Sequence, residues 1–223
     1  MPTKPTRKRK PLRTKAPQRL RERALLETAT AVAGVDEVGR GAWAGPLVAA
    51  AVILDPAYRI RNVRDSKLLK AEDRERLARR IRLHATAVGV GTVTTDEIND
   101  RGFVWALTEA GIRAIKGLAV EPEWVLLDGH HNYFGTRYQC ETIINGDAKE
   151  LCIAAASVIA KVHRDGLMEE LHEQHPAYGF ARNKGYGTPK HRRVLQELGP
   201  TPAHRQAWKP IAALLQQPLP LST

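Results

Sequence analysis

The sequence has few cysteines and no long hydrophobic run. Cys140 and Cys152 are too few and too loosely spaced for a disulfide framework or a zinc cluster. No apolar run approaches the roughly 20 residues that a membrane-spanning helix needs, and no apolar segment follows the basic N-terminus as it does in a secretory signal. A Walker-type glycine loop is also absent, which argues against nucleotide hydrolysis. These absences favour a protein of the reducing cytosol, so we expect a cytoplasmic location.

The positive charge is concentrated at the N-terminus. The formal net charge of the chain is +11, and residues 1–24 contribute +9 of it through ten Lys or Arg and one Glu. Because this segment contains almost no apolar residues, it cannot offset the entropy of ordering, and we expect a disordered basic tail over residues 1–24. Basic tails attract phosphate backbones, but many only increase solubility. The charge alone therefore leaves open whether this tail contacts nucleic acid.

The rest of the chain has the composition and the patterning of an α/β protein. The sequence is 43% hydrophobic and 26% charged, as in ordinary globular proteins. Apolar runs and alternating patterns predict strands in residues 31–38, 47–54, 85–94, 124–127 and 138–144. Helical spacing and start signals predict helices in residues 72–83, from 95, 104–119, 147–162, 166–173, 189–198 and 205–215. The order of these elements predicts a mixed β-sheet flanked by helices, with a helical C-terminal portion.

Four carboxylates lie at the ends of predicted apolar elements, and they are the strongest functional signal. Such a set suits hard divalent cations such as Mg²⁺ or Mn²⁺, which prefer oxygen ligands. Two ions roughly 4 Å apart can activate a water and stabilise the leaving oxygen of a phosphodiester. The four residues are Asp36, Glu37, Asp128 and Asp147.

Two of these carboxylates also have plain structural interpretations. Asp128 precedes Gly129, and Asp-Gly is a common turn signal. Asp147 has Glu150 three residues later, which is the spacing of a helix capping box. On spacing alone, a turn and a helix cap remain alternatives to metal binding at these positions.

The pair Asp36-Glu37 has the weakest structural alternative, because strands disfavour both residues. Successive strand residues point to opposite faces of a sheet. The two carboxylates can therefore share one site only if the strand ends or bulges near them, which Gly39 and Gly41 would permit.

Several short motifs together resemble the ribonuclease HII family. They occur in order from about residue 31 to residue 208, and Gly-Arg-Gly favours this family over the related type HIII. The motifs are Val35-Asp36-Glu37-Val38-Gly39-Arg40-Gly41, Gly45-Pro46-Leu47, Asp65-Ser66-Lys67, Leu127-Asp128-Gly129, Gly146-Asp147-Ala148, Ile153-Ala154-Ala155-Ala156-Ser157, Ala160-Lys161-Val162, Arg164-Asp165 and Lys184-Gly185-Tyr186-Gly187-Thr188 with His191.

The resemblance implies a ribonuclease H-like fold with a catalytic core over residues 25–165 and a helical extension over residues 166–223 that contacts substrate. It implies hydrolysis of the RNA strand of RNA/DNA hybrids and incision 5′ to single ribonucleotides in duplex DNA, leaving 3′-hydroxyl and 5′-phosphate ends. It also implies that the four carboxylates bind Mn²⁺ or Mg²⁺ and are catalytic. The residues that it assigns to substrate binding are Gly39, Arg40, Gly41, Lys67 and Tyr186.

Two features depart from the family pattern or extend it. The usual His-Arg-x-Ser-Phe reads His204-Arg205-Gln206-Ala207-Trp208 here, so the chain lacks the hydroxyl of that motif. Gln216-Gln217-Pro218-Leu219 is too weak a signal to predict contact with a sliding clamp. We expect a monomer. Two other functions stay open as alternatives: another two-metal nuclease of the superfamily, such as a junction resolvase, and a basic nucleic-acid-binding protein without activity.

Overall fold

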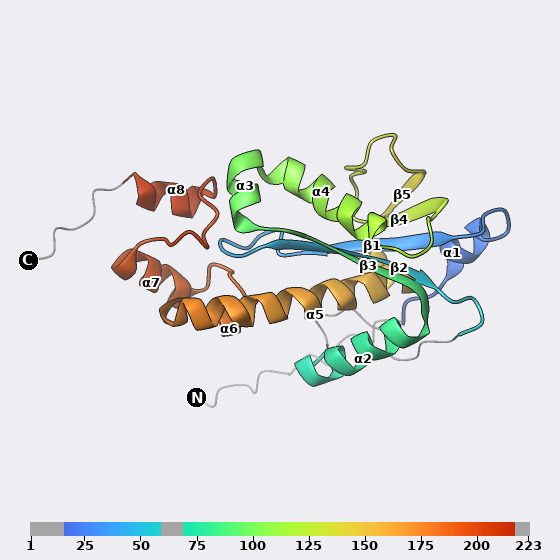
Figure 1. The fold of residues 1–223 in the computed structure, drawn as a ribbon, viewed down its shortest axis with the longest axis horizontal. Helices are drawn as coiled ribbons and strands as arrows, with labels where there is room; N and C mark the ends of the chain where they lie inside the picture. The colour runs from blue at the N-terminus through green and yellow to red at the C-terminus, as the bar shows by residue number, and fades with distance from the viewer. Residues whose placement is uncertain (1–15, 59–68, 217–223) are drawn as a thin grey trace, which may run out of the picture.

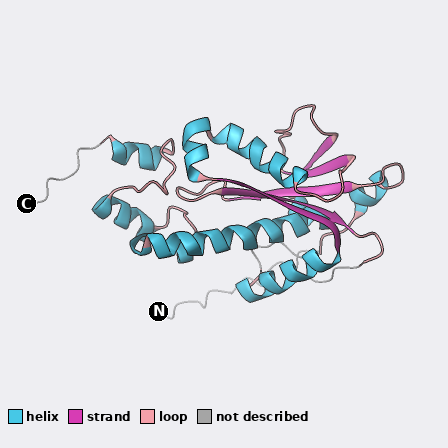
Figure 2. Ribbon diagram, in the orientation of Figure 1, coloured by secondary structure: helices cyan, strands magenta, loops and turns pink. Residues whose placement is uncertain are grey.

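The computed structural model describes residues 16–58 and 69–216, which form a mixed sheet between two layers of helices (Figure 1). The sheet has five strands in the order β3-β2-β1-β4-β5 (Figure 2). The strands are β1 Val32–Val38, β2 Leu47–Leu54, β3 Ala85–Val93, β4 Trp124–Asp128 and β5 Cys140–Ile143. The helices are α1 Leu20–Leu25, α2 Ala71–His84, α3 Thr95–Arg101, α4 Phe103–Lys116, α5 Leu151–Gln174, α6 Phe180–Asn183, α7 Pro189–Leu198 and α8 Lys209–Leu215, with short 3₁₀ turns η2 Gly146–Ala148 and η3 Pro176–Tyr178.

The sheet confirms the predicted α/β class and its mixed character. β1 pairs with β2 in antiparallel fashion and with β4 in parallel fashion, and β4 pairs with β5 in parallel fashion. All residues of β2 are buried, as the uninterrupted apolar run of residues 47–54 predicts. β1 and β2 therefore lie in the middle of the core.

Helix α5 covers one face of the sheet and α4 covers the other (Figure 1). The small side chains of residues 154–157 are buried, so α5 can lie close to β1. Gly34 of β1 allows the closest approach, because a Cβ atom there would overlap the main chain of Cys152 and Ile153. The small-residue run of α5 and Gly34 thus fix the distance between this helix and the sheet.

The predicted disorder of residues 1–24 is wrong for the last residues of that segment. Residues 16–24 were expected to be part of a disordered tail, but α1 begins at Leu20 and buries Leu25 in the core. The carboxylate of Glu150 accepts the main-chain N–H of Arg21 at 3.0 Å and so satisfies the start of this helix. That partner lies far along the chain, where local composition gives no sign of it. Residues 1–15 lie outside the described residues.

The predicted boundary between core and extension falls inside a helix. α5 is continuous from Leu151 to Gln174, so residue 165 marks no division, and the separate helix expected at 166–173 is the second half of α5. Beyond it, α6, α7 and α8 share an apolar cluster that includes Phe180, Leu195 and Ile211, together with Ala44 of the loop after β1. The C-terminal helices are thus anchored on that loop.

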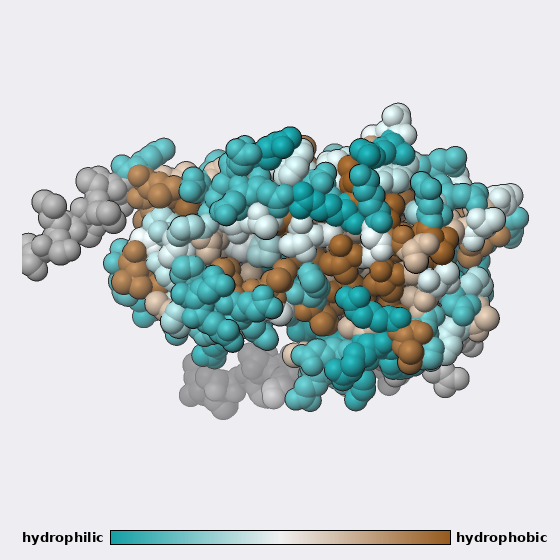
Figure 3. All heavy atoms as spheres, in the orientation of Figure 1, coloured by the Kyte–Doolittle hydropathy of each residue, from teal (hydrophilic) through white to brown (hydrophobic). Residues whose placement is uncertain are grey.

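Hydrophilic side chains cover most of the face shown in Figure 3, and hydrophobic ones gather along its middle, where β3 runs between the helical layers. Val88 and Val90 of β3 are only partly buried. Within residues 16–58 and 69–216, no helix combines the length and the apolar character needed to cross a bilayer.

Candidate active site

The predicted carboxylates lie at the carboxyl end of the parallel strands. The pairing of β1 with β4 ends at Val35 and Leu127, and Asp36 and Asp128 come directly after these residues. β5 ends beside Asp128, and its chain continues into η2, which carries Asp147. Ends of neighbouring parallel strands meet at one edge of a sheet, where side chains from distant segments come together.

Asp36 and Glu37 do not lie at a strand end or at a bulge on the β2 side. β1 continues to Val38 and keeps its register with β2 throughout. On the β4 side, however, pairing stops before Asp36, which opens the sheet at this point. The geometric condition inferred from the sequence is therefore met on one side of the strand only.

The electrostatics show that the four carboxylates lie close to one another. Burial raises the pKa of Asp36 well above its usual value, and the charges of Glu37, Asp128 and Asp147 raise it further. A hydrogen bond with Ser157 of α5 opposes this rise. The structure thus places in one neighbourhood four acids that are distributed over 112 positions of the sequence.

Glu37 has a hydrogen-bond partner for only one of its two carboxylate oxygens among the described residues. Burial raises its pKa, the nearby guanidinium of Arg40 lowers it, and Asp128 raises it. Arg40 donates from Nη1 to Oε1 of Glu37 at 3.2 Å, while Oε2 is buried without a hydrogen-bond partner among the described residues. The buried hydroxyl of Tyr133, a residue that is itself only partly buried, also lies beside Glu37 and lowers its pKa. A buried carboxylate oxygen in this state is a candidate ligand for a cation.

Two main-chain N–H groups orient the other acids. The N–H of Glu37 donates to Oδ1 of Asp36 at 2.8 Å, and the N–H of Gly146 donates to Oδ1 of Asp128 at 2.6 Å. The second bond connects Asp128 to the residue before Asp147. Gly129 has φ +103°, and the chain bends directly after Asp128. The capping box that remained an alternative for Asp147 and Glu150 is not formed, because α5 starts at Leu151 and Glu150 caps α1 instead.

The donor chemistry of this cluster fits a hard divalent cation. The cluster would offer the cation carboxylate oxygens as ligands. The negative charges of the four carboxylates repel one another, and one oxygen of Glu37 has no hydrogen-bond partner among the described residues. Within the described residues, no three acidic, histidine or cysteine side chains already stand in metal-binding geometry. A cation would therefore have to draw the carboxylates together.

The Gly39-Arg40-Gly41 loop lies next to this cluster. Gly39 has φ +93°, a conformation that favours glycine, and a side chain there would overlap Arg164. Among the described residues, and apart from the neighbours of Gly41 in the chain, the only atom within 4 Å of a Cβ built on Gly41 belongs to the ring of Tyr186, which is partly exposed. The structure thus places Tyr186 beside the loop. Lys67, the remaining predicted substrate contact, lies outside the described residues.

The 39–46 loop and the segment around Tyr186 are joined directly. The N–H groups of Trp43 and Ala44 both donate to the carbonyl oxygen of Gly185, at 2.8 and 3.3 Å. The N–H of Gly45 donates to Ala203 at 2.9 Å. These bonds connect the loop after β1 to two parts of the C-terminal extension.

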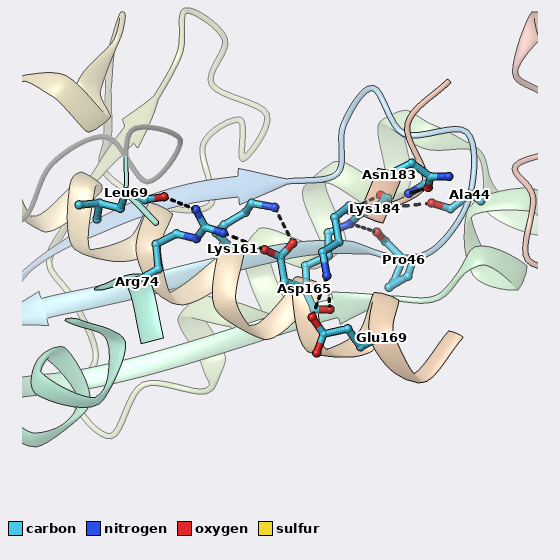
Figure 4. Close-up of polar contacts among 11 residues, drawn as sticks. Ala44, Pro46, Leu69, Arg74, Lys161, Asp165, Glu169, Asn183 and Lys184 are labelled. Atoms are coloured by element: carbon cyan, nitrogen blue, oxygen red, sulfur yellow. Dashed lines mark hydrogen bonds and ion pairs between the residues drawn. The ribbon is translucent and has the colours of Figure 1, made fainter. Parts of the chain in front are cut away.

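Sequence reasoning left several residues of this region without a role. Tyr133 gave no signal, because a lone tyrosine in a loop has no distinctive pattern. Ser157, Arg164 and Arg205 each lie in a family-like motif, which could have pointed to them. Asp165, of the same motif as Arg164, accepts hydrogen bonds from Lys161 and Arg74 (Figure 4).

Comparison with known proteins agrees with the geometry. Residues 33–211 match the family model described as Ribonuclease HII. Ribonuclease HII of Koribacter versatilis is 49% identical over 182 residues, covering 81% of this chain and 70% of that protein. Ribonuclease HII of Cereibacter sphaeroides is 46% identical over 200 residues, covering 89% and 93% of the two chains.

Solved structures show the same fold. Ribonuclease H2 from Pyrococcus horikoshii superimposes with a TM-score of 0.72 at 28% identity, covering 82% of this chain and 96% of that one. RNase HII from Archaeoglobus fulgidus, solved as a complex with PCNA, gives a TM-score of 0.68 at 30% identity, with 80% and 95% coverage. The crowded carboxylates, the adjoining loop and these likenesses lead to one conclusion: the chain belongs to the ribonuclease HII family of nucleases.

Proposed function

We propose that this protein hydrolyses the RNA strand of RNA/DNA hybrids and incises duplex DNA 5′ to single ribonucleotides, leaving 3′-hydroxyl and 5′-phosphate ends. The observation that carries the proposal is the position of the Gly39-Arg40-Gly41 loop, which lies between the carboxylate cluster and Tyr186. The carboxylates that could support phosphodiester cleavage thus lie beside a loop and a tyrosine that could recognise the ribose.

The four carboxylates Asp36, Glu37, Asp128 and Asp147 would hold Mn²⁺ or Mg²⁺ in this proposal. Such ions, when bound as a pair, activate a water and stabilise the leaving oxygen. The protein contributes by fixing the oxygens: the N–H groups of Glu37 and Gly146 orient Asp36 and Asp128. Arg40 holds one oxygen of Glu37 and leaves the other available.

Recognition of ribose would come from the loop and from Tyr186. Glycines let the main chain approach the sugar closely, and the 2′-hydroxyl is the group that distinguishes RNA from DNA. Arg40 is largely exposed and can reach a phosphate while it pairs with Glu37. The ring of Tyr186 offers a face on which a nucleotide can stack. Lys67 is proposed as a further phosphate contact from outside the described residues.

The wider setting of the enzyme is also a proposal. We propose that it acts as a monomer in the cytoplasm and that its C-terminal helices contact the duplex. The Archaeoglobus fulgidus neighbour was solved with PCNA, but residues 217–219 of the weak clamp-like segment lie outside the described residues.

The decisive test is incubation with duplex DNA that contains one ribonucleotide, with Mg²⁺ or Mn²⁺ and with a chelator. We expect incision 5′ to the ribonucleotide, its loss with chelator and its loss in Asp36→Asn. Asp165→Asn is the matched control, because that carboxylate pairs with Lys161 and Arg74 away from the cluster. No incision by the wild type, or full incision by Asp36→Asn, would disprove the proposal.

The same assay separates the alternative functions. A junction-resolving nuclease would cut all-DNA branched substrates without a ribonucleotide. A binding protein without activity would keep its affinity with a chelator and when all four carboxylates are replaced, and would bind more weakly when residues 1–24 are removed. Neither alternative explains why Tyr186 adjoins the glycine loop.

A further inference from the structure

Two arginines that have no place in the chemistry proposed above lie fully buried beneath the 39–46 loop. Arg164, on α5, donates to the carbonyl oxygens of Pro46 at 2.8 Å, Lys184 at 2.9 Å and Ala44 at 3.2 Å. Both Arg164 and Arg205 have a relative exposure of 0%. Their guanidinium groups therefore make contacts inside the protein and not with solvent.

Arg205 binds the same loop from the C-terminal side. It donates to the carbonyl oxygen of Gly45 at 3.0 and 3.1 Å, to Pro46 at 3.1 Å and to Arg40 at 3.3 Å. Its own main-chain N–H donates to Trp43 at 2.8 Å. The carbonyl groups of the loop thus converge on two guanidinium groups.

Arg164 also connects the loop to the segment that carries Tyr186. Ala44 and Pro46 of the loop lie close to Lys184 of the C-terminal extension in Figure 4. The guanidinium carbon of Arg164 lies 5.8 Å from the centre of the Tyr186 ring. A Cβ atom on Gly39 would overlap the Arg164 side chain, so the loop main chain rests directly on it. One side chain therefore sets the spacing between the glycine loop and Tyr186.

This arrangement is costly if stability is its only purpose. Within residues 16–58 and 69–216, neither guanidinium forms an ion pair with a carboxylate. Burial, together with the neighbouring charge of Arg164, lowers the pKa of Arg205 from 12.5 to about 9. Buried charges without a charged partner are disfavoured even when they are hydrogen-bonded.

Arg113 shows what a purely structural arginine of this protein looks like. It pairs with Glu97 at 2.7 Å and with Glu109 at 2.9 Å, and it is about one-third exposed. It also donates to the carbonyl oxygen of Thr92 at 2.7 Å. Arg113 thus makes several hydrogen bonds, as Arg164 and Arg205 do, but its charge is paired and partly exposed.

We propose that Arg164 and Arg205 are positioning residues that fix the Gly39-Arg40-Gly41 loop against Tyr186, so that the preference for ribose over deoxyribose depends on them. The inference rests on the proposed function and deepens it. A planar guanidinium donates in several fixed directions at once, whereas a lysine ammonium carries the same charge without that geometry. Replacement by lysine therefore separates geometry from charge.

The experiment measures binding of two duplexes, one with a single ribonucleotide and one of DNA only. Full-length Arg164→Lys, Arg205→Lys and the control Arg113→Lys are prepared in an Asp36→Asn background, which prevents cleavage. We expect the ratio of the two Kd values to shrink about tenfold in Arg164→Lys and in Arg205→Lys, the loss expected for one or two hydrogen bonds to a charged group. The Kd for all-DNA duplex and the ratio in Arg113→Lys should not change.

Each outcome bears on a different claim. If the Asp36→Asn protein with both arginines intact binds the two duplexes equally, the proposed function and this inference are both overturned. Wild-type preference that persists unchanged in folded Arg164→Lys and Arg205→Lys would overturn the inference alone. If neither lysine variant folds, as judged by thermal unfolding, the two arginines are structural supports and the inference is also overturned. Increased hydrogen exchange confined to residues 39–46 and 184–187 in a folded variant would support it.

Discussion

The Nε2 atoms of His191 and His204 lie 3.1 Å apart, and both imidazole rings are fully buried. The main-chain N–H of Thr201 donates to Nδ1 of His204 at 2.9 Å, so the proton of this neutral ring lies on Nε2. His191 then accepts at Nε2 and donates from Nδ1, which lies 3.0 Å from the carbonyl oxygen of Tyr186. The two neutral rings form a directional hydrogen-bond chain from Thr201 to Tyr186.

Protonation of this chain should destabilise the protein at mildly acidic pH. Burial, with the neighbouring His191, lowers the pKa of His204 from 6.5 to about 4. The unfolded chain therefore binds this proton more readily than the folded one. The free energy of unfolding should fall as the pH is lowered from about 6.5 to about 4, by up to roughly 3 kcal/mol.

Urea unfolding between pH 7 and pH 4 measures this effect. His204→Gln should show a smaller dependence on pH than the wild type over this range. His131→Gln, at an exposed position, is the control and should keep the wild-type slope. Equal slopes for His204→Gln and the wild type would contradict the assignment of a neutral buried ring.

The carboxylate cluster should make the metal-free protein less stable than it could be. Because burial and the charges of Glu37, Asp128 and Asp147 raise the pKa of Asp36, stability contributed by its protonated form is lost as the pH rises above 3.8. Asp36→Asn removes this charge and keeps an oxygen that can accept a hydrogen bond. We expect it to raise the free energy of unfolding at neutral pH in the presence of a chelator.

Thermal unfolding with and without Mn²⁺ checks this expectation. Mn²⁺ should raise the Tm of the wild type more than that of Asp36→Asn, since the variant has lost a proposed ligand. Asp165→Asn, whose carboxylate is paired with Lys161 and Arg74, should instead lower the Tm. A lower Tm for Asp36→Asn in chelator would show that its charge is well compensated in the folded protein.

Elements with strong local patterns could be predicted from the sequence almost to the residue. The apolar run of residues 47–54 is strand β2, and Pro189 with a basic amphipathic segment predicts α7, which ends at Leu198. The alternation of residues 85–94 predicts β3, which ends at Val93. In each case, the alternation or the run of apolar residues within one short segment indicates which side chains are buried.

Features that depend on distant contacts could not be predicted in this way. Glu150 caps the start of α1, and it lies 129 positions after Arg21, the residue whose N–H it accepts. The position of Tyr186 beside Gly41 also depends on bonds between remote segments. The sequence could name these residues through a family resemblance, but it held no physical sign of their neighbours.

The close contact between α5 and β1 predicts opposite effects for two glycine substitutions. Gly34→Ala would force a methyl group into the main chain at Cys152 and Ile153, where nothing flexible can move aside. We expect it to lower the free energy of unfolding by roughly 3 kcal/mol or more. Gly166→Ala places the same methyl group on α5 where, apart from its own helix, no atom of the described residues lies within 4 Å, and it should raise stability by roughly 0.5 to 1 kcal/mol. Urea unfolding of both variants checks the pair, and a similar sign for both would contradict the packing described.

The ring face of Tyr186 should contribute to binding of a ribonucleotide-containing duplex. The side chain is 38% exposed, and its ring lies beside Gly41, so one face is available for stacking. Base stacking on an aromatic residue is worth about 1 to 3 kcal/mol, so Tyr186→Ala should weaken binding about tenfold or more. Tyr186→Phe keeps the ring and should bind nearly as well as the wild type. The comparison is made in the Asp36→Asn background, with Tm values to show that all variants are folded. Equal losses in Tyr186→Phe and Tyr186→Ala would assign the contact to the hydroxyl group instead of the ring, and no loss in either would exclude Tyr186 from the binding surface.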